Sequence, residues 1–219
     1  MLSLSAQLGD LPKLLRPQIR ALLESDRQLE QMEAYLRLLV HWNERINLTG
    51  ARTLDELVQR HVGESLAALP LLPNGPLAVA DVGSGAGFPG LPLRIARPDL
   101  RLFLVERQHK KAVFLRQAAL EAGLDQVEVV EEPWESWSAA GSAARLDCVL
   151  SRAALDLEVL LQGANRLLRP AGRVLLFLGQ EKARPLAEHP ILGGSLLWKA
   201  ESLLPGSERR YLIQLEKPL

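Results

Sequence analysis

The chain is poor in cysteine and has no long apolar run, and each shortage excludes a class of protein. Among its 219 residues the only cysteine is Cys148. A disulfide framework and a multi-cysteine zinc or iron–sulfur site are therefore excluded, and we expect no metal site. No stretch of about 18 uncharged apolar residues occurs, so we expect no membrane span. Residues 1–10 lack the features of a secretory signal, and together these absences favour a cytoplasmic protein.

Net charge is also missing, because 26 basic residues balance 26 acidic ones. A polyanion would therefore have to bind a local basic patch. Acidic residues concentrate between 121 and 137, and basic residues between 94 and 116. These segments are either two solvated helix faces or, for the basic one, a surface for RNA phosphates. The basic residues are Arg94, Arg97, Arg101, Arg107, Lys110, Lys111 and Arg116.

Apolar residues make up 47% of the chain, enough for a sizeable core, and their spacing predicts a helical N-terminal part. Residues 27–44 carry apolar side chains at helical spacing, and Thr53 begins a capping box that predicts a second helix to about Leu69. The proline-rich stretch 70–76 ends it. We therefore expect a helical region over 1–72 and a second domain over 73–219.

Apolar runs and helical segments alternate beyond this break, which predicts a doubly wound, mostly parallel sheet. Gly123 and Gly172 stand where helices should stop. The last part differs, since Ser195–Leu203 and Tyr211–Glu216 flank a Pro-Gly turn and predict an antiparallel hairpin. The expected strands lie near 77–82, 100–106, 126–131, 146–151 and 173–178, and the expected helices near 88–97, 108–122 and 156–168.

A glycine-rich turn follows the first expected strand and leads into a helix. Such a turn lets a ligand approach the backbone closely, next to free helical N–H groups. The second strand ends at Glu106, where an acid can hold ribose hydroxyls. The pattern therefore predicts an adenosine-type cofactor. The turn reads Ala80-Asp81-Val82-Gly83-Ser84-Gly85-Ala86-Gly87-Phe88-Pro89-Gly90.

Three interpretations of this turn remain open: a dinucleotide site, an S-adenosylmethionine site and a purely structural turn. The match of Gly85 to Gly90 with G-x-G-x-x-G favours a dinucleotide. However, Asp81 at the strand end would repel a pyrophosphate, whereas it suits a cofactor with a cationic end. The terminal hairpin also favours a methyltransferase sheet. Arg152 adds a charge at the carboxyl end of a buried strand, a position typical of a functional site.

The chain resembles a known family at several motifs in the same order and spacing. The motifs are Trp42-Asn43 with Asn47-Leu48-Thr49, Arg60-His61 with Glu64-Ser65, residues 81–93, Lys110-Lys111 with Phe114-Leu115, and Ser151-Arg152-Ala153. Over roughly residues 25–219 it is similar to the bacterial glucose-inhibited-division protein B family. The resemblance implies a class I, Rossmann-like methyltransferase. Such an enzyme would use S-adenosylmethionine to methylate guanine N7 in small-subunit (16S) ribosomal RNA, free or within a 30S-type particle. No obligate protein partner is indicated.

The resemblance also implies roles for individual residues. Gly83 and Phe88 would line the methionine and ribose side of the cofactor, and Glu106 would accept from the ribose hydroxyls. Arg152 would face the site where guanine meets the methyl group, as the one residue in a catalytic role. The full cofactor-binding set comprises Asp81, Gly83, Gly85, Phe88, Glu106, Trp134, Glu135 and Arg152, with Trp134 and Glu135 beside the adenine.

Three positions depart from the family pattern. The chain reads Glu132-Pro133-Trp134 before Glu135, where the family often has a basic residue. Leu178-Gly179 replaces Lys-Gly after the fifth strand, and Glu64 replaces an aspartate. Lys182 is near enough in sequence to substitute for the missing lysine. Two other functions stay open on the residues alone: an NAD(P)-dependent oxidoreductase, and an RNA-binding module without catalysis.

Overall fold

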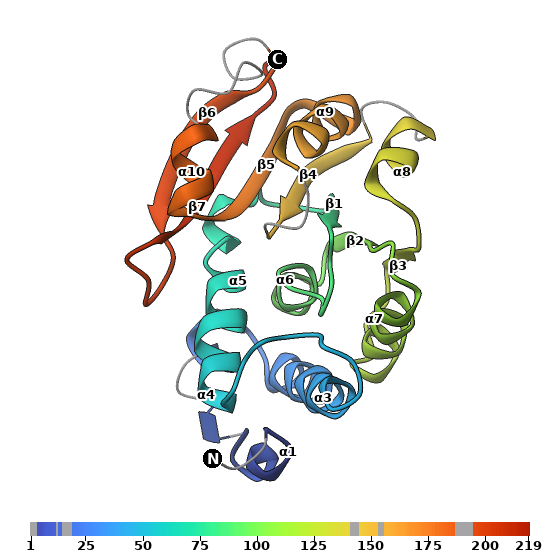
Figure 1. The fold of residues 1–219 in the computed structure, drawn as a ribbon, viewed down its shortest axis with the longest axis vertical. Coiled ribbons are helices and arrows are strands. Elements are labelled where there is room, and N and C mark those ends of the chain that lie inside the picture. Colours follow the sequence, from blue (N-terminus) through green and yellow to red (C-terminus); the bar gives the residue numbers. More distant parts are fainter. Residues whose placement is uncertain (1–3, 12, 15–18, 141–144, 153–155, 187–194) are drawn as a thin grey trace.

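The computed structural model describes residues 4–11, 13–14, 19–140, 145–152, 156–186 and 195–219. Its centre is a seven-stranded sheet of order β3-β2-β1-β4-β5-β7-β6 (Figure 1). The first five strands in this order are parallel, and β7 is antiparallel to both β5 and β6. This confirms the predicted doubly wound sheet with a terminal hairpin. The strands are β1 (Leu77–Val82), β2 (Leu100–Val105), β3 (Val127–Val130), β4 (Leu146–Ser151), β5 (Leu168–Gly179), β6 (Leu197–Leu203) and β7 (Arg210–Glu216).

Helices cover both faces of the sheet, which is why its central strands read as apolar runs. One face packs Val79, Leu104 and Leu150 against the N-terminal helices, α6 and α7. The other packs Val82 and Val149 against α8, α9 and α10. The longer helices are α3 (Asp26–Asn43), α6 (Gly90–Ala96), α7 (His109–Glu121), α8 (Trp134–Ala140), α9 (Leu157–Leu167) and α10 (Gln180–Leu186). The short helical segments are α1 (Leu4–Gln7), η1 (Leu8–Asp10), η2 (Arg20–Leu22), α4 (Leu54–Glu56), η3 (Leu57–Gly63), α5 (Glu64–Leu66) and η4 (Leu69–Leu71).

Helix α3 connects the N-terminal region to the sheet domain. It begins at a capping box in which Ser25 and Gln28 satisfy each other's backbone N–H groups. Gln28 Nε2 also donates to the carbonyls of Ile95 and Ala96, at the end of α6. Further along, the hydroxyl of the fully buried Tyr35 donates to the Ala86 carbonyl at 2.7 Å. Helix α3 thus contacts both the glycine turn and the end of α6.

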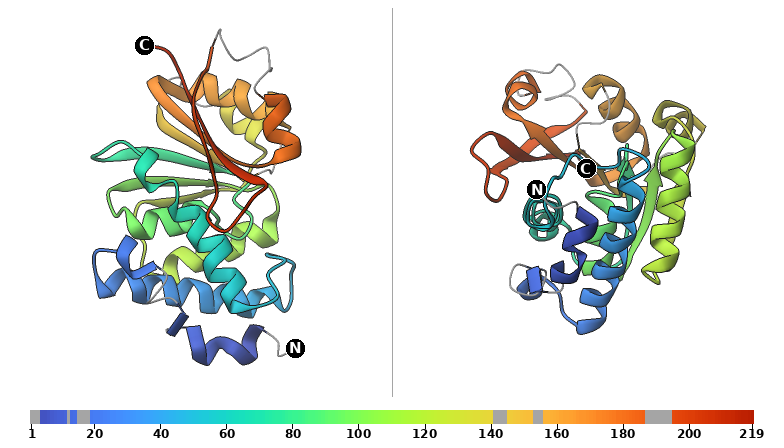
Figure 2. Two further views of the ribbon diagram at one scale, coloured as in Figure 1. Left: turned by 90° about the vertical axis from the view of Figure 1, so that its left-hand side faces the viewer. Right: turned by 60° about the horizontal axis from the view of Figure 1, so that its bottom comes forward.

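The predicted boundary between 72 and 73 falls in the connection from η4 to β1. The hydrophobic core is continuous across it, because Leu36 and Leu57 of the N-terminal helices belong to the same cluster as Leu91 and Leu102. Figure 2 shows these helices lying along one side of the sheet. Residues 1–3, 12 and 15–18 of the predicted helical region lie outside the described residues. No helix within the described ranges is long and apolar enough to cross a membrane.

Most predicted elements agree with the structure within a few residues, but two expectations were wrong. Gly172 does not stop a helix: α9 ends at Leu167, and Gly172 lies within β5, whose pairing with β4 shifts register between Leu146 and Cys148. The helix begun by Thr53 is not one regular helix to Leu69. It becomes π-helical over η3, and its last α-helical residue is Leu66.

Replacing Tyr35 by phenylalanine removes a buried donor and leaves the Ala86 carbonyl without that partner. We expect the free energy of unfolding to fall by about 1–2 kcal/mol, measured by urea denaturation. Tyr211→Phe is the control, because the Tyr211 hydroxyl makes no hydrogen bond within the described part of the chain. Equal stability of the two variants would contradict a stabilising role for the Tyr35 hydrogen bond.

Candidate functional site

Two clefts open at the carboxyl edge of the sheet, one on each side of its centre. The chain leaves the neighbouring strands β1 and β4 toward opposite ends of the sheet, which makes this point the usual ligand site of an open α/β sheet. The first cleft, of about 210 Å³, lies over β1, β2 and β3. The second, of about 550 Å³, lies over β4, β5 and β7. The first is lined by Gly83, Gly85, Val105, Glu106, Arg107, Gln108, Lys111, Glu132, Pro133, Trp134 and Glu135.

The glycine turn forms one wall of the first cleft. Gly83, Gly85 and Gly87 all have positive φ angles, which residues with a side chain rarely adopt. A Cβ added to Gly85 would meet only the Gly83 carbonyl within 4 Å, so a side chain there would extend into open space. A Cβ on Gly90, by contrast, would lie 2.7 Å from Asp81 Oδ2. Gly85 thus leaves room for a ligand, and Gly90 lets α6 approach β1.

Asp81 lies fully buried beneath this turn. Its Oδ2 accepts from the Gly90 N–H at 2.9 Å, and its Oδ1 has no hydrogen-bond partner among the described residues. Burial raises the pKa of Asp81 to about 7, the Gly90 N–H and Arg152 oppose the rise, and Glu106 adds to it. An unpartnered buried carboxylate oxygen beside a glycine turn fits a cationic group and disfavours a phosphate.

Glu106 closes the opposite side of the turn. Its Oε2 accepts from the Gly85 N–H at 3.0 Å, and its Oε1 accepts from the Gln108 N–H at 2.8 Å. Each carboxylate oxygen keeps a second lone pair. Glu106 is therefore already oriented, with acceptor capacity left for two hydroxyl groups. This geometry fits a ribose.

Trp134 and Glu135 begin α8 at the far end of the first cleft. Trp134 also packs against Trp137, with ring centroids 5.8 Å apart, and its buried Nε1 has no hydrogen-bond partner in the described part of the chain. A Cβ on Gly163 would lie 2.5 Å from that Nε1, so helix α9 holds the indole closely. The indole thus packs in the hydrophobic core and also lines the first cleft. Glu135 is exposed at the cleft's edge.

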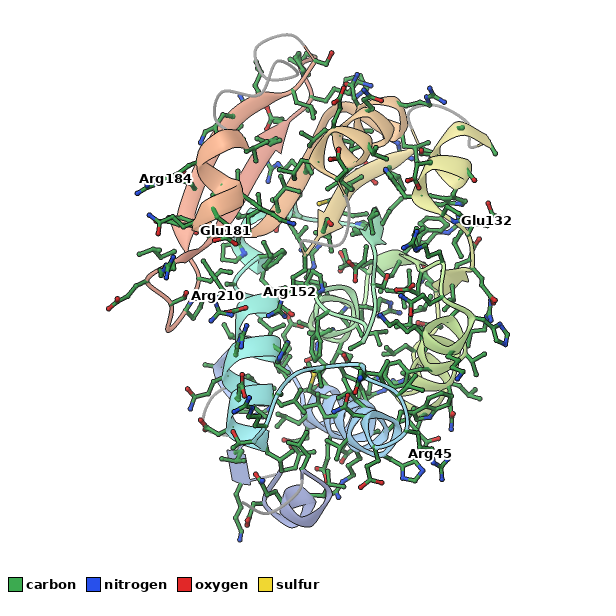
Figure 3. All side chains as sticks on the ribbon, in the orientation of Figure 1. Arg45, Glu132, Arg152, Glu181, Arg184 and Arg210 are labelled. Carbon is green, nitrogen blue, oxygen red and sulfur yellow. The ribbon has the colours of Figure 1, made fainter. Side chains whose placement is uncertain are left out.

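Arg152 does not line the first cleft but the second, together with Arg60, Glu64, Phe177, Leu178, Gly179, Glu181, Leu204, Ser207, Arg209 and Arg210. Arg152 Nη2 donates to Glu64 Oε2 at 2.9 Å, and Arg152 Nη1 lies 3.1 Å from His61 Nδ1. In Figure 3, Arg210 and Arg152 of the second cleft lie beside one another, and Glu132 of the first cleft lies apart from them.

The guanidinium of Arg152 determines the tautomer of His61. Because arginine only donates, Nδ1 of His61 must accept, and its Nε2–H then donates to Thr49 Oγ1 at 3.1 Å. Burial, with Arg152 and Arg60, lowers the pKa of His61 to about 3, so the imidazole is neutral near pH 7. Phe88 packs against this imidazole, with centroids 5.1 Å apart. Phe88 is thus placed between the glycine turn and Arg152.

The predicted site residues therefore fall into three groups. Gly83, Gly85, Glu106, Trp134 and Glu135 line the first cleft. Asp81 is buried below the turn, Phe88 is buried against His61, and Arg152 lines the second cleft. Residue 153 of the Ser-Arg-Ala motif lies outside the described residues. The described residues contain no group of three or more His, Cys, Asp or Glu arranged for a metal ion.

Sequence reasoning missed several residues of this edge. Tyr35 carries no sequence signal beyond a buried helix position. Arg210 joins the second cleft only because Gly179 pairs with it in the antiparallel register of β5 and β7. Only a known hairpin register could have identified Arg210 in advance.

A family model decides between the open interpretations. It is GidB, rRNA small subunit methyltransferase G, and it matches residues 28–201. The chain belongs to the GidB family. The family resemblance, the methyltransferase class and the cofactor S-adenosylmethionine predicted from the sequence are thereby confirmed, and the oxidoreductase alternative is not supported.

Individual relatives agree with membership of the GidB family. The chain is 42% identical over 162 residues to ribosomal RNA small subunit methyltransferase G of Halorhodospira halophila, covering 74% of this chain and 75% of the relative. It is 36% identical over 213 residues to the protein of that name from Xanthomonas axonopodis pv. citri, covering 93% of this chain and 97% of the relative.

Solved structures agree with the fold. A SAM dependent methyltransferase from Aquifex aeolicus matches with a TM-score of 0.59 at 12% identity, covering 75% of this chain and 95% of that structure's chain. TrmN from Thermus thermophilus matches with a TM-score of 0.56 at 23% identity, covering 70% and 48%.

The raised pKa of Asp81 predicts that cofactor binding is coupled to proton release. Below about pH 7 the free protein holds a proton on Asp81. A bound ammonium group favours the carboxylate, so affinity for S-adenosylhomocysteine should rise as pH increases from 6 to 8. Calorimetric titration at pH 6.5 in two buffers of different protonation enthalpy should detect the released proton. Asp81→Asn should bind more weakly and without this pH dependence, and an unchanged proton count in that variant would contradict the assignment.

Glu106→Gln tests the proposed ribose acceptor. A glutamine has only one oxygen, so its amide group would face either the Gly85 or the Gln108 N–H. We expect affinity for S-adenosylhomocysteine to fall by about 1–3 kcal/mol, measured by calorimetry. Glu128→Gln is the matched control, because Glu128 lies exposed on the adjacent strand β3 outside both clefts. Equal affinity in the two variants would exclude the role of Glu106.

Proposed function

We propose that this protein transfers a methyl group from S-adenosylmethionine to N7 of a guanine in small-subunit ribosomal RNA. The observation that carries this proposal is the pair of clefts at one edge of the sheet, in a chain of the GidB family. The first fits an adenosine with a cationic tail. The second is basic and adjoins it across the centre of the sheet, which suits a nucleotide. We also place the protein in the cytoplasm, because its proposed substrate is ribosomal RNA.

The chemistry needs no general base. Guanine N7 has a free lone pair and carries no proton, and bound S-adenosylmethionine supplies a methyl group that is activated by its sulfonium. The residues of the protein must therefore position the base, align it with the methyl group and provide suitable electrostatics. The described part of the second cleft fits this demand, since its charged residues are arginines and glutamates held in ion pairs or exposed at the rim.

Arg152 is the residue proposed to position the guanine. Its guanidinium is fixed by Glu64 and His61, and its side chain keeps 19% exposure toward the cleft. An arginine held in this way can donate to guanine O6 or to a phosphate with little loss of side-chain entropy. The target base would have to be unpaired or turned out of its helix to reach it.

RNA phosphates are proposed to contact the basic segment between 94 and 116. Four of its arginines are in ion pairs: Arg94 with Asp125, Arg97 with Asp99, Arg101 with Glu128 and Arg116 with Glu131. Across the described ranges, Arg107, Lys110 and Lys111 make no ion pair. Arg107 lies just before α7, and Lys110 and Lys111 lie in its first turn; Arg107 and Lys111 also line the first cleft. All three cations would be free to bind phosphates.

Arg152→Ala tests the proposed function. The rate of methyl transfer to small-subunit RNA in a single turnover should fall at least tenfold, about 1.4 kcal/mol or more of barrier. Affinity for S-adenosylhomocysteine should change by less than about threefold, about 0.65 kcal/mol, because Arg152 does not line the first cleft. Radiolabelled methyl transfer and calorimetry measure the two effects, and mass spectrometry of the RNA identifies the methylated position.

Arg37→Ala is the control, since Arg37 is ion-paired with Glu33 on α3 and lines neither cleft. A parallel loss of rate and cofactor affinity in Arg152→Ala would assign Arg152 to the cofactor instead. Transfer to a position other than guanine N7 would overturn the proposed product.

A further inference from the structure

Glu64 has an unusual position for a carboxylate, because it is completely buried between two arginines. Its Oε2 is 2.9 Å from Arg152 Nη2, and its Oε1 is 2.5 Å from Arg210 Nη1. The side chain of Glu64 is only 1% exposed, whereas those of Arg152 and Arg210 are 19% and 28% exposed. One acid therefore joins the end of β4 to the start of β7, at the floor of the second cleft.

The π-helical segment η3 contributes to this arrangement. It carries His61 and leads directly into Glu64, and both residues hold the same guanidinium of Arg152. A π-helical turn shifts the positions of the residues that follow it relative to a regular helix, and such turns are frequent at functional sites. Arg152 thus has one charged and one neutral acceptor, both supplied by the N-terminal helices.

The charges of the second cleft make Glu64 important for the proposed reaction. Arg60, Arg152, Arg209 and Arg210 line the cleft, and among the described residues that line it the only acids are the buried Glu64 and the exposed Glu181. Burial raises the pKa of Glu64, but Arg152 and Arg210 oppose the rise and favour the carboxylate. His61 is neutral, and fully buried Asp81, which also interacts with Arg152, lies below the glycine turn. Among the described residues that line the second cleft, Glu64 is therefore the one buried acid that offsets these arginines.

A guanine methylated at N7 becomes a cation during the transfer. Arginines that attract the RNA backbone would oppose this new charge unless a nearby acid offsets them. We propose that Glu64 is a positioning residue that holds Arg152 and Arg210 side by side and offsets their charge against a base that becomes cationic. This inference rests on the proposed function, since it requires a nucleophile that gains positive charge.

Glu64→Gln tests the inference, because it keeps the shape of the side chain and removes only its charge. Binding of small-subunit RNA should be equal or tighter, since the cleft becomes more positive. The rate of methyl transfer at saturating RNA should fall at least tenfold. A merely structural role would instead raise KM and lower kcat together, or leave both unchanged, and either outcome would overturn the inference.

Two further variants make the test specific. Glu64→Asp keeps the charge and should retain a transfer rate at saturating RNA within about threefold of the native protein. A fall of more than tenfold in that variant would also overturn the inference, even if Glu64→Gln does not fold. Glu33→Gln is the matched control: Glu33 forms an ion pair with Arg37 on α3, lines neither cleft, and its loss should not change kcat.

Measurements on the native protein separate this inference from the proposed function. Calorimetry with S-adenosylhomocysteine should give the same affinity for Glu64→Gln as for the native protein, because Glu64 does not line the first cleft. If the native protein binds this compound but transfers no methyl group to small-subunit RNA, the proposed function fails. If the native protein transfers it and Glu64→Gln does so equally fast, only the role of Glu64 fails.

Discussion

The structure depends on the close contact between the end of strand β1 and the start of helix α6. Asp81 accepts the Gly90 N–H, and no side chain fits at position 90 between this carboxylate and Leu104. This contact brings α6 against the sheet and bends the glycine turn over the strand end. The turn then presents the Gly85 N–H to Glu106, and both residues line the first cleft. The first cleft, the proposed cofactor site, therefore depends on residue 90 being a glycine.

The N-terminal helices act as a support for this edge of the sheet. Through Tyr35 and Gln28, helix α3 holds the glycine turn and the end of α6. The segment that follows supplies His61 and Glu64 to Arg152. The N-terminal region thus supports the glycine turn through buried hydrogen bonds to the backbone, and it contributes charged residues to the second cleft.

Local signals in the sequence were sufficient for much of this architecture. The strands of a sheet buried on both faces are apolar runs, and the glycines around Gly85 are spaced as a ligand-binding turn requires, so both were predicted. The burial of Asp81 and its unpartnered oxygen depend on how α6 packs, which no local pattern contains. The junction of Glu64 with Arg152 and Arg210 joins three distant segments through an irregular helix and a hairpin register. Such a cluster can be recognised only once those segments are placed in space.

The two clefts draw on different stretches of the chain. Residues between Gly83 and Glu135 line the first, whereas the second needs Arg60 and Glu64 from the first third of the chain and Arg210 from its last strand. During synthesis, all the residues that line the first cleft are therefore made before the last residues of the second, which end at Arg210. The second cleft is complete only when the last strand has left the ribosome and paired with β5. The newly made protein should thus gain the parts that hold the methyl donor before it gains the parts that select what receives the methyl group.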